Sequence, residues 1–280
     1  MLKKFEHNFQ GKIWNTAFGN NTAVLEIRDE NTRQVSFSAL NLQSGKILWQ
    51  DLRPEKSWWL ALVGVFGGYL VLHKYSSQQK PEPKGLLILS LQTGEIIKKV
   101  DDWIFFNCQE NSLVVYQMDE NNLPIYQEII LEKLSIDLFK ELKINSELKQ
   151  IDYQYISTNQ QINKSNLIPK PPLTQNSSPT HYPEDSPHFP AIFNFLYRLI
   201  GIEAQKGVDY LEIANKIVIS YYIYSHKLFQ NYLLVITHDR QILLNDLIAT
   251  TEGIGIDTFT LQSDTLLYVK NENYFVGYEL

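Results

Sequence analysis

The densest group of side chains that could do chemistry lies in residues 181–188, which read HYPEDSPH. Two imidazoles, His181 and His188, and two carboxylates, Glu184 and Asp185, fall within eight residues. Histidine nitrogen and carboxylate oxygen both suit zinc or manganese, so these four side chains are candidate ligands for a divalent metal. They are also candidates for acid and base catalysis. Their spacing matches no closed metal motif, and the two prolines in the run restrict how they could converge.

The same residues have a structural interpretation, which the sequence favours. Ser186 followed by Pro187 is typical of a helix start, and the acidic residues before them suit a helix N-terminus. Apolar residues then recur at helical spacing, and Gly201 follows as a stop signal. We therefore predict one helix over residues 187–200. Its apolar face is expected to pack on the rim of a sheet or at a channel mouth, with partner binding as the alternative.

The remaining reactive side chains are isolated. Cys108 is the single cysteine, which excludes an intramolecular disulfide and a CxxC metal site, and its apolar surroundings predict a buried thiol. His73, His226 and His238 have no companion ligand at short spacing, so structural or solvated roles are expected. The chain contains no glycine-rich phosphate loop, no GxSxG elbow and no HExxH. A protein without a cofactor is predicted, and a non-catalytic role is favoured over an enzyme.

The elements that would position any site follow from a repeat. Residues 40–49 (LNLQSGKILW) return as residues 89–98 (LSLQTGEIIK), in each case a strand, a tight glycine turn and a second strand. Around the first block, short apolar runs predict four strands at residues 12–18, 22–27, 34–42 and 46–49. Around the second block, the predicted strands are 58–66, 69–75, 86–91 and 95–100. An offset of 49 residues with four strands per unit is typical of β-propeller blades.

Weaker units keep this rhythm to the end of the chain. A third unit is predicted at residues 103–131, a complete unit at 207–247 and a unit with only three strands at 256–280. Residues 3–9 are predicted to supply the missing strand by pairing beside residues 275–280, which would close a ring and remove exposed sheet edges. The gap before residue 207 leaves room for one more unit. The expected fold is all-β, a propeller of about six four-stranded blades, with five or seven as alternatives.

One insertion interrupts the predicted single domain of residues 1–280. From residue 157 the composition becomes polar, and 7 of the 11 prolines fall between residues 169 and 190. Proline donates no ladder hydrogen bond, so this stretch cannot form a central strand and is expected to be an extended loop. The insertion, loop and helix together, spans about residues 157–200.

Charge and hydropathy limit the partners. The chain has 25 basic and 31 acidic residues, a net charge of −6, and its basic residues are scattered. This pattern predicts no binding to nucleic acid or to an anionic membrane. The first residues do not resemble a signal peptide, and no apolar run is long enough to span a bilayer. A cytoplasmic monomer is expected.

The block at residues 40–49 resembles the repeat of PQQ-like, or quinoprotein-type, β-propellers. In that family the glycine turn is followed by a tryptophan that docks between blades, and Trp49 stands at this place, whereas the second block has Lys98. The resemblance implies a propeller fold and little about function. Family dehydrogenases use a vicinal disulfide and calcium, and a chain with one cysteine departs from them. The whole chain is similar to uncharacterised bacterial propeller-like proteins with no assigned activity.

These observations lead to two functional hypotheses. The first is a non-catalytic cytoplasmic propeller that binds a protein or a small molecule through its blade loops, since function in such folds lies on loops. The alternative is a metal-assisted hydrolase that uses the side chains of residues 181–188.

Overall fold

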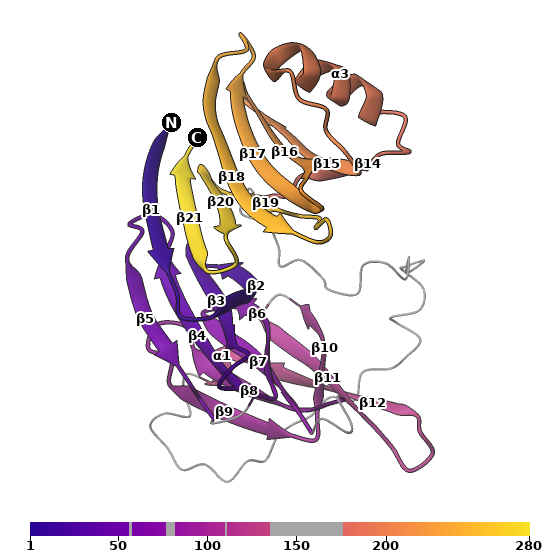
Figure 1. Ribbon diagram of the computed structural model, residues 1–280. Coiled ribbons are helices and arrows are strands. Elements are labelled where there is room, and N and C mark those ends of the chain that lie inside the picture. Colours follow the sequence, from indigo (N-terminus) through magenta and orange to yellow (C-terminus); the bar gives the residue numbers. More distant parts are fainter. Residues whose placement is uncertain (56–57, 77–81, 110, 135–175) are drawn as a thin grey trace. The chain divides into compact units, whose positions relative to one another are not determined.

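The computed structural model describes residues 1–55, 58–76, 82–109, 111–134 and 176–280. These residues form two compact units (Figure 1). Unit 1 combines residues 1–13 with residues 174–280, and unit 2 comprises residues 14–173. Antiparallel sheets make up most of both units, so the described chain is all-β apart from two helical segments.

Unit 2 begins with two four-stranded sheets, and in both of them strands consecutive in sequence lie side by side. The first has the order β2-β3-β4-β5, and its strands are Lys12–Gly19, Thr22–Asp29, Gln34–Asn41 and Ile47–Leu52. The second has the order β6-β7-β8-β9, with strands Leu60–Phe66, Tyr69–Tyr75, Pro83–Ser90 and Ile96–Asp101. Both agree with the predicted strands to within a few residues. Up-and-down pairing of consecutive strands is therefore confirmed for both repeats.

The two repeat blocks form the same turn. Gly45 and Gly94 have positive φ angles of 66° and 74°, which glycine adopts without steric cost. The N–H of Gly45 donates to the carbonyl of Asn41, and the N–H of Gly94 donates to that of Ser90, at 2.8 Å in both cases. Asn41 and Ser90 also accept from a backbone N–H three residues ahead through their side-chain oxygens. The offset of 49 residues thus marks a repeat in three dimensions as well as in sequence.

The two sheets share one apolar core. Fully buried side chains of β3 and β4 pack against those of β6, β7 and β8, with Phe37 among the largest. The indole of Trp49 adds a polar contact, because its Nε1 donates to the carbonyl of Leu91 at 2.9 Å. A buried ion pair adds another. Glu26, 1% exposed, contacts Arg28 of its own strand at 2.6 Å and accepts the N–H of Leu62 in the second sheet.

A third sheet completes the described part of unit 2. Its order is β10-β11-β12, with strands Ile104–Gln109, Ser112–Met118 and Pro124–Ile130, followed by the one-turn helix α1 at Leu131–Leu134. One face of this sheet packs on the second sheet through Leu113 and Val115. The third predicted unit is confirmed as three paired strands. The predicted fourth unit falls largely on residues outside those described.

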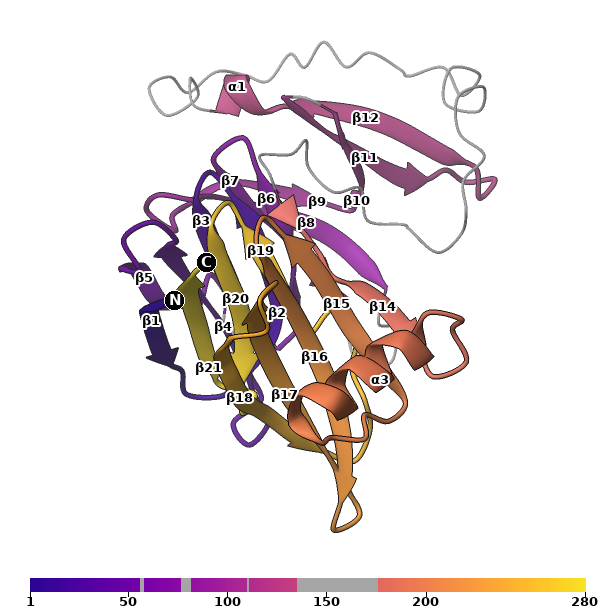
Figure 2. The ribbon, with the colours of Figure 1, turned by 90° about the horizontal axis from the view of Figure 1, so that it is seen from above.

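Unit 1 contains a five-stranded sheet covered by a helix. The sheet has the order β14-β15-β16-β17-β18, with strands Thr180–Pro183, Gly207–Ile213, Lys216–Ser225, Leu228–Thr237 and Ile242–Thr251. Helix α3, Phe189–Ile200, lies along this sheet (Figure 2). Phe189 and Leu196 of the helix are buried against the sheet, so its apolar face is explained by packing.

The ends of α3 confirm one part of the prediction and correct another. Gly201 closes the helix in the left-handed conformation with a φ of 71°, and its N–H donates to the carbonyl of Tyr197, as expected. The N-cap is His188, not Ser186. Ser186 instead accepts the N–H of Phe189 through its carbonyl in a turn before the helix, and Pro190 occupies the first turn. The chain offers two proline starts three residues apart, and the later one is used.

The last sheet joins sequence-remote pieces in the order β1-β21-β20-β19-β13. Its strands are Leu2–Asn8, Tyr274–Glu279, Thr265–Lys270, Phe259–Gln262 and Asn176–Ser177. The antiparallel pairing of β1 with β21 confirms the predicted role of the N-terminal strand. Phe5 lies over Gly277, where an added Cβ would clash with the ring.

The proline-rich insertion also differs in part from its description as a loop. Its described residues include β13 and β14, which pair at the edges of two sheets and not at their centres. Proline is tolerated there because an edge strand leaves one side of its backbone unpaired. The ring and the number of blades are unconfirmed. Among the described helices, none is long and apolar enough to cross a membrane.

Candidate functional site

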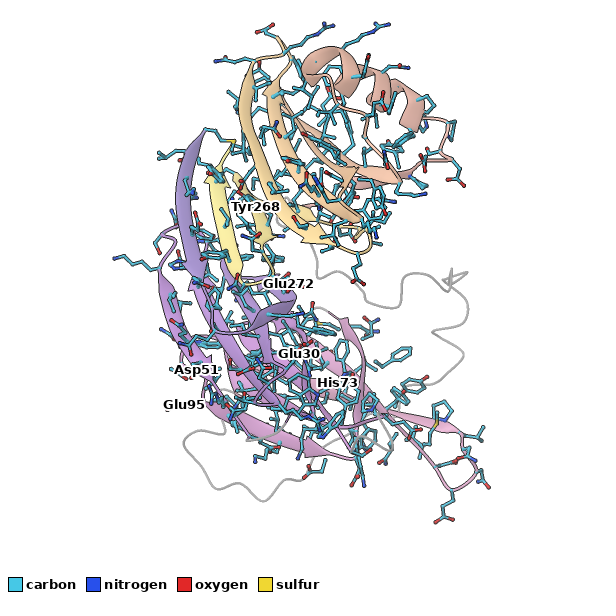
Figure 3. The ribbon with its side chains drawn as sticks, viewed as in Figure 1. Glu30, Asp51, His73, Glu95, Tyr268 and Glu272 are labelled. Carbon is cyan, nitrogen blue, oxygen red and sulfur yellow. The ribbon has the colours of Figure 1, made fainter. Side chains whose placement is uncertain are left out.

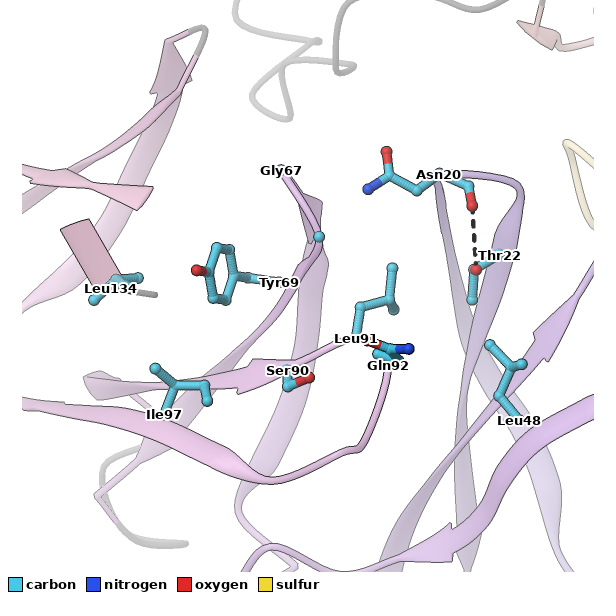
Figure 4. Close-up of a pocket in the computed structure, with 11 residues that line it drawn as sticks. Asn20, Thr22, Leu48, Gly67, Tyr69, Ser90, Leu91, Gln92, Ile97 and Leu134 are labelled. Atoms are coloured by element: carbon cyan, nitrogen blue, oxygen red, sulfur yellow. Dashed lines mark hydrogen bonds between the residues drawn. The ribbon is translucent and has the colours of Figure 1, made fainter. Parts of the chain in front are cut away.

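A groove of about 440 Å³ opens within unit 2, where the turns of the first two sheets meet (Figure 4). The two hairpin turns that border it have positive φ at both central residues, Asn20 and Asn21 in the first sheet and Gly67 and Gly68 in the second. Asparagine and glycine are the residues that tolerate this geometry, so the sequence fixes tight turns here. The turn after β8 supplies Ser90, Leu91 and Gln92, and strands β5 and β9 supply Leu48 and Ile97.

The lining is polar on some sides and apolar on others. The carboxamides of Asn20 and Gln92 and the hydroxyls of Thr22, Tyr69 and Ser90 contribute hydrogen-bonding groups. The apolar surface comes from leucine and isoleucine side chains. None of the described lining residues carries a formal charge. Such a groove suits an uncharged molecule with both hydroxyl or amide groups and an apolar face, since unmatched charges would be desolvated without a partner.

Two lining groups are held in place by local hydrogen bonds. The hydroxyl of Thr22 donates to the carbonyl of Asn20 at 3.3 Å, which ties β3 to the preceding turn. The hydroxyl of Ser90 accepts the N–H of Thr93 at 3.2 Å within the repeat turn. The sequence marked these turns as architecture and did not identify them as a site. The available signal was that the turn after β2 and the turn after β8 carry amide and hydroxyl side chains.

Of the four residues predicted as ligands, His181 has a defined polar environment. Its Nδ1 lies 2.7 Å from Oδ1 of Asp209, a neighbour across the β14–β15 pairing that is 3% exposed. The other carboxylate oxygen of Asp209 accepts from both the N–H and the hydroxyl of Thr258, at 2.9 and 2.8 Å. The pair therefore joins β14 to β15 and to the segment before β19. Asp209 is 28 residues from His181 and 49 residues from Thr258, so spacing along the sequence could not reveal these contacts.

The other three predicted residues lie apart from this pair. Glu184 is exposed and lies 3.8 Å from Lys206, and Asp185 is exposed in the turn before α3. The ring of His188 contacts that of Tyr182, with centroids 5.3 Å apart. In the described part of the chain, no group of three or more His, Cys, Asp or Glu side chains could hold a metal ion. The metal hypothesis for these residues stays a prediction.

An apolar hollow of about 300 Å³ lies in unit 1 between α3 and its sheet. Ile192 and Phe195 of the helix line it together with Tyr210 and Ile217 of the strands. Burial, reinforced by a hydrogen bond to Glu212, raises the pKa of Tyr210 to about 12, so its hydroxyl keeps its proton at neutral pH. Tyr182 and His188 also line the hollow, so His188 is the one of the four predicted residues that borders it.

His73 is a structural histidine in unit 2 (Figure 3). Its Nε2 accepts the N–H of Phe105 at 3.3 Å, which links the second sheet to the third. Burial lowers its pKa from 6.5 to about 4, because a charged imidazole would lose its hydration. A neutral, accepting imidazole at neutral pH confirms the structural role expected from the sequence.

This low pKa predicts an acid-sensitive contribution to stability. The folded protein resists protonation of His73 while the unfolded chain accepts a proton below pH 6.5, so stability is full above that pH and falls as the pH approaches 4. Between pH 7 and pH 5 the loss due to His73 should be about 1–2 kcal/mol. In His73→Gln the amide oxygen can still accept the N–H of Phe105. The loss of stability between pH 7 and pH 5, measured by urea unfolding, should therefore be smaller than in the unchanged protein by that amount. Equal losses in both proteins would contradict the assignment.

Comparison with known proteins gives one domain match over part of the chain and no activity. Residues 18–97 match the model of a domain of unknown function, DUF4905, and this span covers most of the first two sheets. No curated protein matches the chain. Among solved structures, an exo-beta-1,3-galactanase from Phanerochaete chrysosporium with bound beta-1,3-galactotriose aligns over the whole chain with a TM-score of 0.29 and 8% identity. The chain spans 64% of the length of that galactanase.

A second solved structure is similar at the same level. It is an arginine-to-alanine triple mutant of AofleA from Arthrobotrys oligospora, with a TM-score of 0.27, 12% identity, and coverage of 98% of this chain and 74% of that protein. At these TM-scores neither likeness defines a fold or a function for the chain.

Proposed function

We propose that this protein is a non-catalytic binding module of the β-propeller type, and that the groove at the turns of its first two sheets holds a small uncharged ligand. The observation that carries the proposal is the groove itself, in which the turn after β2 and the turn after β8 present amide and hydroxyl groups beside apolar side chains.

Three features within the units support a propeller. Four-stranded meanders recur at an offset of 49 residues and pack face to face. Trp49 contacts the next sheet through its indole N–H, as the docking tryptophan of PQQ-like repeats would. The N-terminal strand completes the last sheet, as ring closure requires. About six blades, with five or seven as alternatives, remain our proposal for the full chain.

Two properties of the groove support binding over catalysis. Its volume lies within the range of small-molecule sites, roughly 300–1,000 Å³. Its described lining has no carboxylate, imidazole, amine or thiol that could act as acid, base or nucleophile at neutral pH. Hydrogen-bonding groups without such a residue can orient a ligand and leave it chemically unchanged.

Amide-resolved NMR of the full chain can test the proposal with a panel of neutral sugars, polyols and small amides. We expect a binding member to shift the signals of Gly67, Gly68 and Gln92. Gln92→Ala and Tyr69→Phe should each weaken it about fivefold, the effect of one lost hydrogen bond. Tyr197→Phe removes an exposed hydroxyl from α3 in unit 1 and should leave affinity unchanged.

Two results would count against the groove as a ligand site. One is a panel that produces no shifts in these turns at millimolar concentration. The other is tighter binding of sugar acids or amino sugars than of their neutral counterparts, since an uncharged lining cannot select for charge.

A further inference from the structure

Helix α3 carries two apolar stripes, and packing on the sheet of unit 1 accounts fully for one of them. Phe189 and Leu196 of the first stripe are buried in the core between helix and sheet. Ala191, Ile192 and Phe195 form a second stripe on the flank of the helix, because residues three and four apart share a helix face. The two larger side chains of this stripe are only partly buried. All three border the hollow of about 300 Å³ in unit 1.

The sheet supplies the other side of the hollow, and that side is mostly aromatic. Tyr182 of β14, Tyr210 of β15 and Ile217 of β16 lie on the face of the sheet that α3 covers (Figure 2). The ring centroids of the two tyrosines are 6.4 Å apart. The ring of Tyr182 also meets that of His188, at the start of α3, with the centroids 5.3 Å apart. Aromatic rings therefore line the hollow from both the sheet and the helix.

The small side chain of Ala191 gives the hollow its opening. Ala191 is exposed to solvent, so a molecule can enter the hollow beside it. Covering the partly exposed apolar side chains around it would remove their surface from water, which favours binding of an apolar molecule. The volume lies at the lower end of the range for small-molecule sites, roughly 300–1,000 Å³. A ligand of one or two rings matches this size.

The polar groups of the hollow favour a neutral ligand with a hydrogen-bond donor. The described lining contains no carboxylate or amine. The hydroxyl of Tyr210 donates to Oε2 of Glu212 at 3.1 Å, and a hydroxyl oxygen that donates its proton can still accept a hydrogen bond. Glu212 lies directly across the β15–β16 pairing from Ile217, so its carboxylate stands at the rim of the hollow. A negative charge at this place disfavours anions.

We propose that the hollow between α3 and strands β14–β16 binds a neutral aromatic molecule of one or two rings that carries a hydroxyl or N–H donor, of the phenol or indole class. The ring of the ligand would pack against Tyr182 and Phe195, since aromatic pairs add to the gain from apolar burial. Its donor would reach the hydroxyl oxygen of Tyr210. This site lies in unit 1 and does not depend on the groove of unit 2, so either can fail alone.

Methyl NMR of the full chain can test the proposal with phenol and indole as probes. We expect both probes to shift the methyl signals of Ile192 and Ile217, with a dissociation constant of about 1 mM or below. The methyl signals of Ile97, which lines the groove of unit 2, should not move. Benzoate should bind about fivefold more weakly than phenol because of its charge, and cyclohexanol by a similar factor because it has no aromatic ring.

Three variants of the chain sharpen this test. Ala191→Leu should fill the hollow and weaken phenol binding about tenfold, because the added side chain occupies the volume of the ring. Asn194→Leu adds the same side chain at an exposed position of α3 outside the lining and should leave the affinity unchanged. Tyr210→Phe removes the acceptor oxygen and should weaken phenol about fivefold, with no effect on toluene, which has no donor.

Other outcomes would overturn the proposal. Shifts confined to Ile97 would assign the probes to the groove of unit 2, and equal affinity of the two leucine variants would exclude the hollow as their site. Equal binding of phenol and cyclohexanol would reject an aromatic ligand class. Tyr210→Phe, which keeps the ring and its packing, keeps the test valid if Ala191→Leu fails to fold, and thermal unfolding identifies that case.

Discussion

Deleting residues 1–8 is expected to lower the free energy of unfolding of unit 1 by roughly 3–5 kcal/mol, the cost of removing one large buried aromatic side chain from a core. Phe5 is 7% exposed and packs on Phe275 at a centroid distance of 5.9 Å. The deletion also leaves one edge of β21 unpaired, while β20 stays paired with its other edge. Chemical denaturation of the full-length and shortened chains measures the difference.

A substitution beneath Phe5 separates strand pairing from a general effect of shortening. Gly277→Val would force the ring off its strand, at a cost of about 1–3 kcal/mol. In the shortened chain the ring is gone, so the same substitution should be nearly neutral, or favourable because valine suits a strand. An equal cost of Gly277→Val in both backgrounds would show that β1 is not seated there in solution.

The second large effect is expected at the buried ion pair of unit 2. Glu26→Ala should destabilise unit 2 by about 3–5 kcal/mol, because Arg28 would keep its charge without its carboxylate. Arg28 also donates to the carbonyls of Trp58 and Leu60, at 3.2 and 2.7 Å. Its guanidinium carbon lies 4.7 Å from the Trp58 ring centroid. These contacts fix the guanidinium, so it cannot move to solvent when the carboxylate is lost.

Replacing both partners distinguishes a lost charge partner from lost packing. Apolar residues of similar volume can take the place of a buried pair at little net cost. Glu26→Leu combined with Arg28→Met should therefore be more stable than Glu26→Ala alone, as measured by urea unfolding. If the double variant were the less stable of the two, the backbone contacts of Arg28 would be the main source of stability.

The strands were predictable because the residues at their ends determine where each strand stops. The turns at Ser44-Gly45 and Thr93-Gly94 each follow an alternating apolar run and need a positive φ, which the glycine adopts. This signal does not depend on residues far away in the sequence. The pairing of the N-terminal strand was predictable for another reason, since the last unit lacked one strand. The start of α3 was misplaced because Ser186-Pro187 and His188-Phe189-Pro190 are both acceptable helix starts. Packing of Phe189 on the sheet favours the second.

The candidate site was not predictable in the same way. The HYPEDSPH run places four reactive side chains close in sequence, but β14 and the turn after it direct them to different surroundings. The partner of His181 is Asp209, a buried aspartate on another strand. The residues of the groove are far apart in sequence and close in space. They lie in separate turns and become neighbours only when the two sheets pack. Turns can therefore be predicted from the local sequence, whereas contacts between residues distant in sequence cannot.

The last sheet has a consequence for synthesis of the chain. Its strands come from residues 2–8, 176–177 and 259–279, so β1 is synthesised long before β21, the strand with which it pairs. Pairings between distant residues form slowly, because a long loop must close before any contact is gained. Phe5 therefore lacks Phe275, the ring on which it packs, until that residue has been made. A chain cut short before residue 274 would leave β1 without the strand that pairs with it.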